Sequence, residues 1–211
     1  MQLVFDASSL IVLTENCFSF LFDNLAASLK KTQLTLPLHV FEEAVSTPIK
    51  IKKFELNALR INELIKQGTL SVVKPTAESK ALGQKIAFLA NNLFFANEKP
   101  LELMHPGECE ALAISLLNEG ILCIEERTTR ALIEQPLDLK IFLEQRQSIK
   151  LFVNKKNFEE FQRLTATVKL VRSADLLAFA FKKKIVAFKP DFLEASLFAM
   201  KYHGCSISSE E

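Results

Sequence analysis

The sequence predicts an α/β protein with a parallel β-sheet, and three observations support this prediction. Short apolar runs typical of buried strands alternate with longer segments whose apolar residues recur at helical spacing. Two of these runs end directly on acids, because LVF at 3–5 precedes Asp6 and ILCI at 121–124 precedes Glu125 and Glu126. Of the 211 residues, 49% are hydrophobic, which is ample for one core. We expect one domain, or one domain with an appended subdomain.

The first half of the chain is predicted to repeat a strand–helix unit. Ser8 and Ser9 are N-cap candidates for the first helix, Pro37 closes the second strand, and Gly68 ends the third helix. The expected strands lie at 3–5, 33–38 and 70–73, and the expected helices at 10–29, 39–47, 49–67 and 77–95.

The second half is predicted to complete the sheet and then become helical. A loop at 96–107 leads into a helix that Pro106 and Gly107 open and Gly120 ends. The strand at 121–124 and a helix at 127–134 follow. Residues 139–146, 157–164, 173–184 and 191–202 then have helical patterns, with one short apolar run at 150–153. No flexible linker divides these parts, so we expect a domain at 1–135 with a helical C-terminal extension at 136–211 packed on it.

Composition excludes several classes of protein. The 26 Lys and Arg against 25 Asp and Glu give a net charge of +1, which argues against holding duplex DNA by bulk charge. No apolar stretch approaches the ~20 residues that span a bilayer, and Met1 is not followed by a secretion signal. Four dispersed cysteines indicate buried free thiols in a reducing compartment. We therefore expect a soluble, cytoplasmic protein without a membrane partner.

Acidic residues gather at the predicted ends of elements. Ligands of an open parallel sheet bind at the carboxyl ends of its strands, so these acids could converge. Clustered carboxylates repel one another, and Mg²⁺ or Mn²⁺ would neutralise them. Acids at helix N-termini also complement the helix dipole, which would explain Glu108, Glu126 and Asp191 without any chemistry. The acids in question are Asp6, Glu42, Glu43, Glu108, Glu110, Glu125 and Glu126.

Three of these segments together resemble PIN domains. LVFDASSLIVL resembles the family's opening strand, PLHVFEEAV its second segment, and HPGECEALAISLLNEGILCIEERTTRAL its Gly-Glu-x-Glu-Ala helix with the following strand and acidic pair. The resemblance covers residues 1–135. VRSADLLAFAF and YHGCSISSEE are similar to the C-terminal extension of prokaryotic, mainly archaeal, PIN proteins.

The resemblance implies a three-layer α/β/α, Rossmann-like sheet and a Mg²⁺- or Mn²⁺-dependent nuclease that acts on RNA. It implies that Ser8 orients the first acid, with Glu42, Glu108 and Glu125 as supporting or competing positions. The implied catalytic and metal-binding residues are Asp6, Glu43, Glu110 and Glu126.

One departure from the family pattern keeps other functions open. The family has Asp after the last strand, where this chain has Glu125 and Glu126, and the extra methylene moves the carboxylate beyond the ~0.5 Å tolerance of a preorganised site. A catalytically degenerate RNA- or protein-binding module is therefore the alternative to an enzyme. A toxin-type ribonuclease held by a protein inhibitor ranks third.

Basic and aromatic residues suggest further contacts. Arg127 and Arg130 follow the acidic pair and could bind RNA phosphates, although solvated positions or pairing with nearby acids explain them equally well. Phenylalanines of the extension could form a homodimer seam, but ordinary core packing explains them better. Those phenylalanines are Phe179, Phe181, Phe192 and Phe198.

Overall fold

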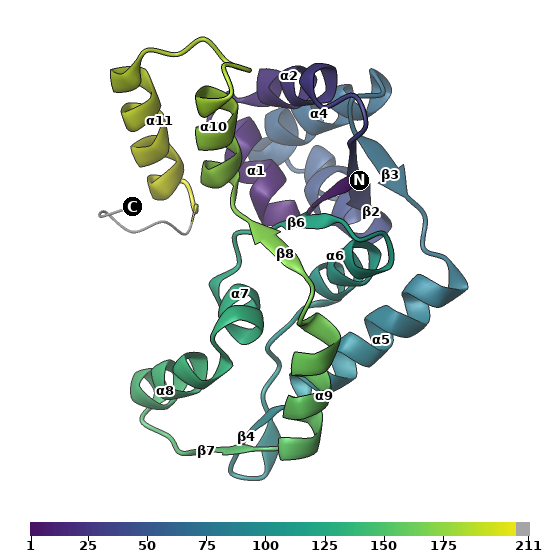
Figure 1. Cartoon of the computed structure of the whole chain (residues 1–211), viewed down its shortest axis with the longest axis vertical. Coiled ribbons are helices and arrows are strands. Elements are labelled where there is room, and N and C mark those ends of the chain that lie inside the picture. Colours follow the sequence, from purple (N-terminus) through teal and green to yellow (C-terminus); the bar gives the residue numbers. More distant parts are fainter. Residues whose placement is uncertain (206–211) are drawn as a thin grey trace.

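The computed structural model describes residues 1–205 and is built around a five-stranded parallel sheet (Figure 1). The strand order is β3-β2-β1-β6-β8, and every neighbouring pair is parallel. The chain adds β2 and β3 on one side of β1 and then returns to add β6 and β8 on the other. The strands are β1 (Gln2–Phe5), β2 (Gln33–Pro37), β3 (Ser71–Val73), β6 (Ile121–Cys123) and β8 (Lys169–Val171).

This order creates a switch point between β1 and β6. At such a point the connections leave the two neighbouring strands in opposite directions, which opens a crevice at their carboxyl ends. Phe5 pairs with Cys123, so the two strands end level with one another. The residues that follow, Asp6 and Glu125, are thereby brought to the same edge of the sheet.

Helices cover both faces of the sheet, and Figure 1 shows them in two groups on opposite sides of it. The expected parallel α/β sheet is confirmed. The helices are α1 (Ala7–Glu15), α2 (Ser19–Ser28), α3 (Leu38–Phe41), α4 (Lys52–Lys66), α5 (Ala77–Asn91), α6 (Pro106–Leu117), α7 (Arg127–Glu134), α8 (Pro136–Gln147), α9 (Lys155–Thr165), α10 (Ser173–Lys182) and α11 (Pro190–Tyr202), with a π-helical turn at Glu42–Ser46 and a 3₁₀ turn at Pro48–Lys50.

Side-chain alternation along the strands separates two hydrophobic cores. Leu3 and Phe5 point to one face, where they pack with α1, α2, α4, α10 and α11. Val4 points to the other face, where it packs with α5, α6, α7, α8 and α9. Because successive side chains of a strand face opposite sides, the buried part of β1 must be apolar at every position, and Leu3, Val4 and Phe5 are each at least 97% buried.

Three predicted elements differ from the structure. The helix predicted at 10–29 is two helices, because Cys17 adopts a left-handed backbone with φ of 63° and ends the first of them. The helix predicted at 77–95 ends at Asn91, because the chain turns into β4 (Phe94–Ala96). The loop predicted at 96–107 contains β5 (Lys99–Pro100), which pairs with β4.

The segment after residue 135 is also less purely helical than expected. It contributes β7 (Leu151–Val153), which pairs with β4 in a small antiparallel sheet. It also contributes β8, which the sequence analysis did not predict and which pairs with β6 in the main sheet. The backbone N–H of Ile124 continues this pairing by donating to Val171. Residues 136–205 therefore complete the main sheet as well as covering it.

Two further expectations can be compared with the structure. Taken singly, no helix within residues 1–205 has the length and apolar character to cross a bilayer; α1 and α2 meet those criteria only as a pair, bent by 111°. All four cysteines are free, but Cys17 is exposed, which corrects the expectation that each is buried. Of the C-terminal stretch YHGCSISSEE, the last six residues lie outside the described part of the chain.

Candidate carboxylate site

Asp6 lies at the carboxyl end of β1, where it is the N-cap of α1. Its backbone N–H donates to the carbonyl of Cys123 over 3.0 Å, which fixes it against β6. Its Oδ2 accepts hydrogen bonds from the Ser8 backbone N–H at 3.2 Å and from the Ser8 hydroxyl at 2.5 Å. The sequence analysis expected Ser8 to orient Asp6, and the structure contains that contact.

The carboxylate of Asp6 is held where it is costly to ionise. Only 5% of the residue is exposed. Burial raises the pKa of Asp6 above its ordinary value, the hydrogen bonds from Ser8 and Ala7 oppose that rise, and the negative charge of Glu126 adds to it. Asp6 is therefore a buried acid with a second acid close enough to repel it.

Glu43 approaches Asp6 from the π-helical turn that follows α3. This turn bonds i to i+5, as the Thr47 N–H donates to Glu42, and such turns recur at functional sites. Desolvation raises the pKa of Glu43, the charge of Asp6 raises it further, and the charges of His105 and His39 lower it. The charges of Glu43 and Asp6 therefore interact.

Gly107 gives Glu43 room against the start of α6. A Cβ placed on Gly107 would lie 3.2 Å from Oε2 of Glu43, closer than ordinary van der Waals contact. A side chain at position 107 would therefore displace Glu43 or shift α6. Glycine at position 107 therefore lets α6 approach Glu43 without this displacement.

Glu108 supplies a third acid from the first turn of α6. It is 8% exposed, and its Oε2 accepts from the Thr129 hydroxyl at 2.6 Å and from the His105 backbone N–H at 3.2 Å. Burial raises the pKa of Glu108 to about 7, and the charges of Asp6 and Glu126 contribute to that rise. Glu108 therefore faces the same group of acids as Asp6.

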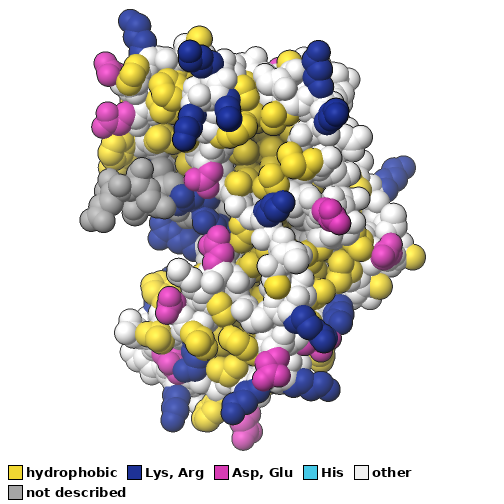
Figure 2. Space-filling view, in the orientation of Figure 1, with side chains coloured by type: hydrophobic (Ala, Val, Ile, Leu, Met, Phe, Trp, Pro, Cys, Tyr) yellow, Lys and Arg dark blue, Asp and Glu magenta, His cyan; other side chains and the backbone are white. Residues whose placement is uncertain are grey.

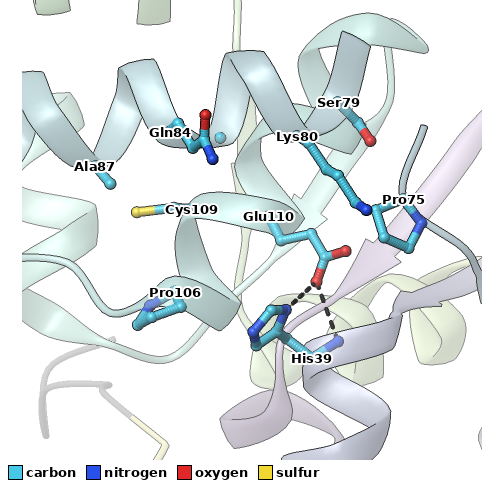
Figure 3. Close-up of a pocket in the computed structure, with 10 residues that line it drawn as sticks. His39, Pro75, Ser79, Lys80, Gln84, Ala87, Pro106, Cys109 and Glu110 are labelled. Atoms are coloured by element: carbon cyan, nitrogen blue, oxygen red, sulfur yellow. Dashed lines mark hydrogen bonds and ion pairs between the residues drawn. The ribbon is translucent and has the colours of Figure 1, made fainter. Parts of the chain in front are cut away.

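Glu110, the residue predicted as the third acid, is held by a histidine just beyond the end of β2, and its predicted role as a metal ligand stays a prediction. Its Oε2 accepts from both the backbone N–H and the ring Nδ1 of His39, each at 3.0 Å (Figure 3). Glu110 lies one turn after Gly107 on α6 and also lines a cavity between α5 and α6.

The two acids after β6 also diverge. Glu126 is exposed, caps α7 by accepting from the Thr128 N–H at 3.0 Å, and raises the pKa of both Asp6 and Glu108. Glu125 is 3% exposed, and its Oε1 accepts from the Ser173 backbone N–H at 2.6 Å at the start of α10. Of these two acids, the charge of Glu126 is the one that acts on Asp6 and Glu108, and its predicted role as the fourth acid stays a prediction.

The four acids that interact, Asp6, Glu43, Glu108 and Glu126, have the donor chemistry of a hard divalent cation. Within residues 1–205, no three His, Cys, Asp or Glu side chains converge closely enough to form a ready metal-binding group. Mg²⁺ usually takes one or two carboxylates directly and keeps its waters, which the remaining carboxylates could orient. Raised carboxyl pKa values are also what a nearby cation would reverse. The donor set therefore fits such an ion.

Basic side chains lie beside the acids. Arg127 begins α7 and is exposed, whereas Arg130 pairs with Glu134 at 3.5 Å on the same helix. Arg172, which the sequence analysis did not single out, directly follows β8 and pairs with Asp175 at 3.1 Å. Figure 2 shows Lys and Arg side chains gathered in the recess between the part of the molecule that carries α10 and α11 and the part that carries α7 and α8.

Sequence reasoning missed the partners of the acids. The hydroxyl of Thr129 and both donors of His39 come from other elements, and no spacing rule connects them to Glu108 or Glu110. Arg172 was missed because β8 is only three residues long. The alternation of apolar residues in VKLV before Arg172 is the one signal that could have revealed it.

Comparison of the chain with protein-family models, with curated proteins and with solved structures finds no match.

Proposed function

We propose that this protein is a divalent-metal-dependent nuclease of the PIN type that hydrolyses phosphodiester bonds in RNA. The observation that carries the proposal is the position of Asp6 at the switch point of a parallel sheet, where its charge raises the pKa values of Glu43 and Glu108 and the charge of Glu126 raises those of Asp6 and Glu108. The sequence resemblance to PIN domains supports the same reading, and with it a Rossmann-like α/β/α fold of that family.

In this mechanism the acidic residues hold the metal ion in position, and a basic residue neutralises the charge of the RNA phosphate. A bound Mg²⁺ or Mn²⁺ would supply a Lewis acid and lower the pKa of a coordinated water. Asp6, oriented by Ser8, and Glu108, oriented by Thr129, would hold the ion, with Glu43 and Glu126 at its periphery. Arg127 is placed to bind a backbone phosphate.

A binding module without catalysis is the second candidate, and one observation favours it. Glu126 already uses Oε1 to cap α7, and its longer side chain stands where the family has Asp. A carboxylate tied to its own helix is less free to meet an ion. Such a module would bind RNA and leave it intact.

Cleavage of labelled single-stranded and structured RNAs, with single-stranded DNA in parallel, tests the proposal. The protein is incubated with Mg²⁺ or Mn²⁺, with EDTA as the metal-free control. Asp6→Asn is the test variant and Asp191→Asn its match, because Asp191 is an exposed Asp in the first turn of α11.

The proposal expects metal-dependent RNA cleavage that Asp6→Asn abolishes and Asp191→Asn retains. Binding of RNA without cleavage by folded wild-type protein would favour the binding module. Equal cleavage by Asp6→Asn and wild type would reject the assigned site.

A further inference from the structure

A cavity of about 410 Å³ lies between α5 and α6, beside the acid group (Figure 3). Ala87 and Gly83 of α5 face Cys109 of α6, and Pro75 and Pro106 complete apolar walls. This volume falls in the range of sites for small organic molecules, which are mainly apolar with a few convergent polar groups.

The polar groups of the cavity come from both of its sides. Gln84, Ser79 and Lys80 extend from α5, and Glu110 lies opposite them with His39 at its side (Figure 3). Oε2 of Glu110 is occupied by His39, but Oε1 is buried and has no hydrogen-bond donor within the described chain. A buried carboxylate oxygen without a donor is costly, and an N–H or O–H group that reaches Glu110 from the cavity would remove that cost.

This requirement separates the possible ligands. A phosphate or carboxylate inside the cavity would be repelled by Glu110, and a purely apolar molecule would leave Oε1 without a donor. A neutral, flat, polar-edged ring system satisfies both conditions, because its faces contact the proline and alanine walls while its edge donates to Glu110. Nucleobases have this combination of properties.

The position of the cavity connects it with the acids. Pro106 and Cys109 line the cavity, while Gly107 and Glu108 between them lie against Glu43 and the acid group. The first turn of α6 therefore separates the two sites. A base in the cavity would leave its own phosphate outside, on the side of the acids.

We propose that this cavity is a nucleobase pocket that holds one unstacked base of the substrate RNA, with guanine as the preferred base. The proposal rests on the nuclease function proposed above. Guanine carries N–H donors on its Watson–Crick edge for Oε1 of Glu110, and its O6 and N7 accept from Lys80 or Gln84. Adenine offers one donor group and lacks O6, so it fills the pocket with fewer matched contacts.

Binding is tested without metal and without cleavage, so that a failure of the nuclease proposal cannot be mistaken for a failure of this one. GMP, AMP, CMP and UMP are titrated separately to millimolar concentration into ¹⁵N-labelled protein, and amide shifts are recorded. GMP is expected to bind most tightly and to shift the amides of Gly83, Gln84 and Ala87.

Two variants locate the bound base. Ala87→Phe fills the cavity and is expected to weaken GMP binding at least about tenfold. Ala81→Phe is the matched control, because Ala81 is an exposed alanine of the same helix that does not line the cavity. Gln84 is exposed, so Gln84→Ala should leave folding intact. This variant is expected to weaken GMP binding and to reduce the preference for GMP over AMP.

Three results would overturn the proposal: no binding of any of the four nucleotides, binding that Ala87→Phe leaves unchanged, or shifts confined to residues outside the cavity. If another nucleotide bound more tightly than GMP, the cavity would still be a nucleobase pocket, but guanine would not be its preferred base. RNA cleavage by a protein that binds no mononucleotide would support the nuclease and refute the pocket.

Discussion

The hydroxyl of Thr129 donates to Oε2 of Glu108 over 2.6 Å, and this contact joins α7 to α6. Both residues are buried, Thr129 completely. Glu126 is the N-cap of α7, so the contact also sets where Glu126 stands relative to Glu108. Two acids from separate helices are thereby held in one place by a single hydroxyl.

Thr129→Val is expected to destabilise the protein by about 2 kcal/mol at neutral pH, because it leaves the Glu108 carboxylate without this donor and keeps the shape of the side chain. Urea denaturation would measure the change. Thr128→Val is the matched control, because the structure gives its hydroxyl no hydrogen bond. If both variants lost the same free energy of unfolding, the cause would be valine in α7 and not the loss of the hydrogen bond to Glu108.

The pKa of Glu108 predicts a pH dependence of stability. It rises from 4.5 to about 7 on folding, so between these values the folded state binds more protons than the unfolded state. Stability that is present below pH 4.5 is therefore lost as pH rises to 7, by the order of 3 kcal/mol. Glu108→Gln should lack this decline, so its stability relative to wild type should increase from pH 5 to pH 8.

Denaturation midpoints of wild type and Glu108→Gln across this range would measure the difference. Asp6 and Glu43 also have raised pKa values, but wild type and Glu108→Gln both contain these two residues. The difference between the two proteins therefore reports on Glu108. Glu119→Gln, just beyond the other end of α6, alters an exposed carboxyl and is the control. If the stability of all three proteins changed with pH in the same way, the raised pKa assigned to Glu108 would be wrong.

The sheet and most of its helices could be predicted because the patterns that specify them are local. Buried strands such as β1 and β6 lie in continuous apolar runs, which Asp6 and Glu125 directly follow. β8 could not be predicted in the same way. A strand of three residues carries too short a pattern, and its place in the sheet depends on pairing with β6, which lies 48 residues earlier (Ile121 with Lys169).

The acids were identified from the sequence, but their grouping was not. Family resemblance points to Glu110, whereas the structure gives Glu108 the hydroxyl of Thr129 and a charge interaction with Asp6. His39 holds Glu110 through contacts 71 residues apart in the sequence. Which of two acids faces a site depends on such distant partners, and a single sequence does not contain that information.

Ser8→Ala is expected to destabilise the protein by about 2 kcal/mol and to raise the pKa of Asp6 further. The hydroxyl donates to Asp6 at 2.5 Å and also accepts from the Glu125 backbone N–H at 3.3 Å, so two buried groups lose a partner. Carboxyl NMR titration would follow Asp6. Ser8→Thr should restore the stability and the pKa of Asp6. Ser28→Ala, at an exposed end of α2, should change neither the stability nor this pKa.

Phe161→Ala tests whether the C-terminal segment is part of the main core. Phe161 of α9 is fully buried in the core that contains Val4 of β1, so the truncation should cost about 3–5 kcal/mol. Phe152→Ala is the control, because Phe152 of β7 is 60% exposed. A single unfolding transition at lower urea for Phe161→Ala is expected. If the loss of stability were confined to a second, separate unfolding transition, the C-terminal segment would be a unit that unfolds independently.

A divalent cation is expected to stabilise the folded protein, because it binds the acid group only when the strands bring the acids together. Thermal unfolding with and without Mg²⁺ at pH 8 measures this effect without any RNA. Asp6→Asn should unfold at a temperature that Mg²⁺ no longer raises. Asp191→Asn, away from the site, should respond to Mg²⁺ as the wild type does.

The same measurement decides between Glu108 and Glu110. Glu108→Gln should lose most of the Mg²⁺-induced rise in Tm, because Glu108 interacts with Asp6 and Glu126. Glu110→Gln should retain it, because His39 already occupies this side chain and the amide oxygen can still accept from His39. The opposite result, with the rise lost only in Glu110→Gln, would mean that α6 turns Glu110 toward the cation and would restore the assignment made from the sequence.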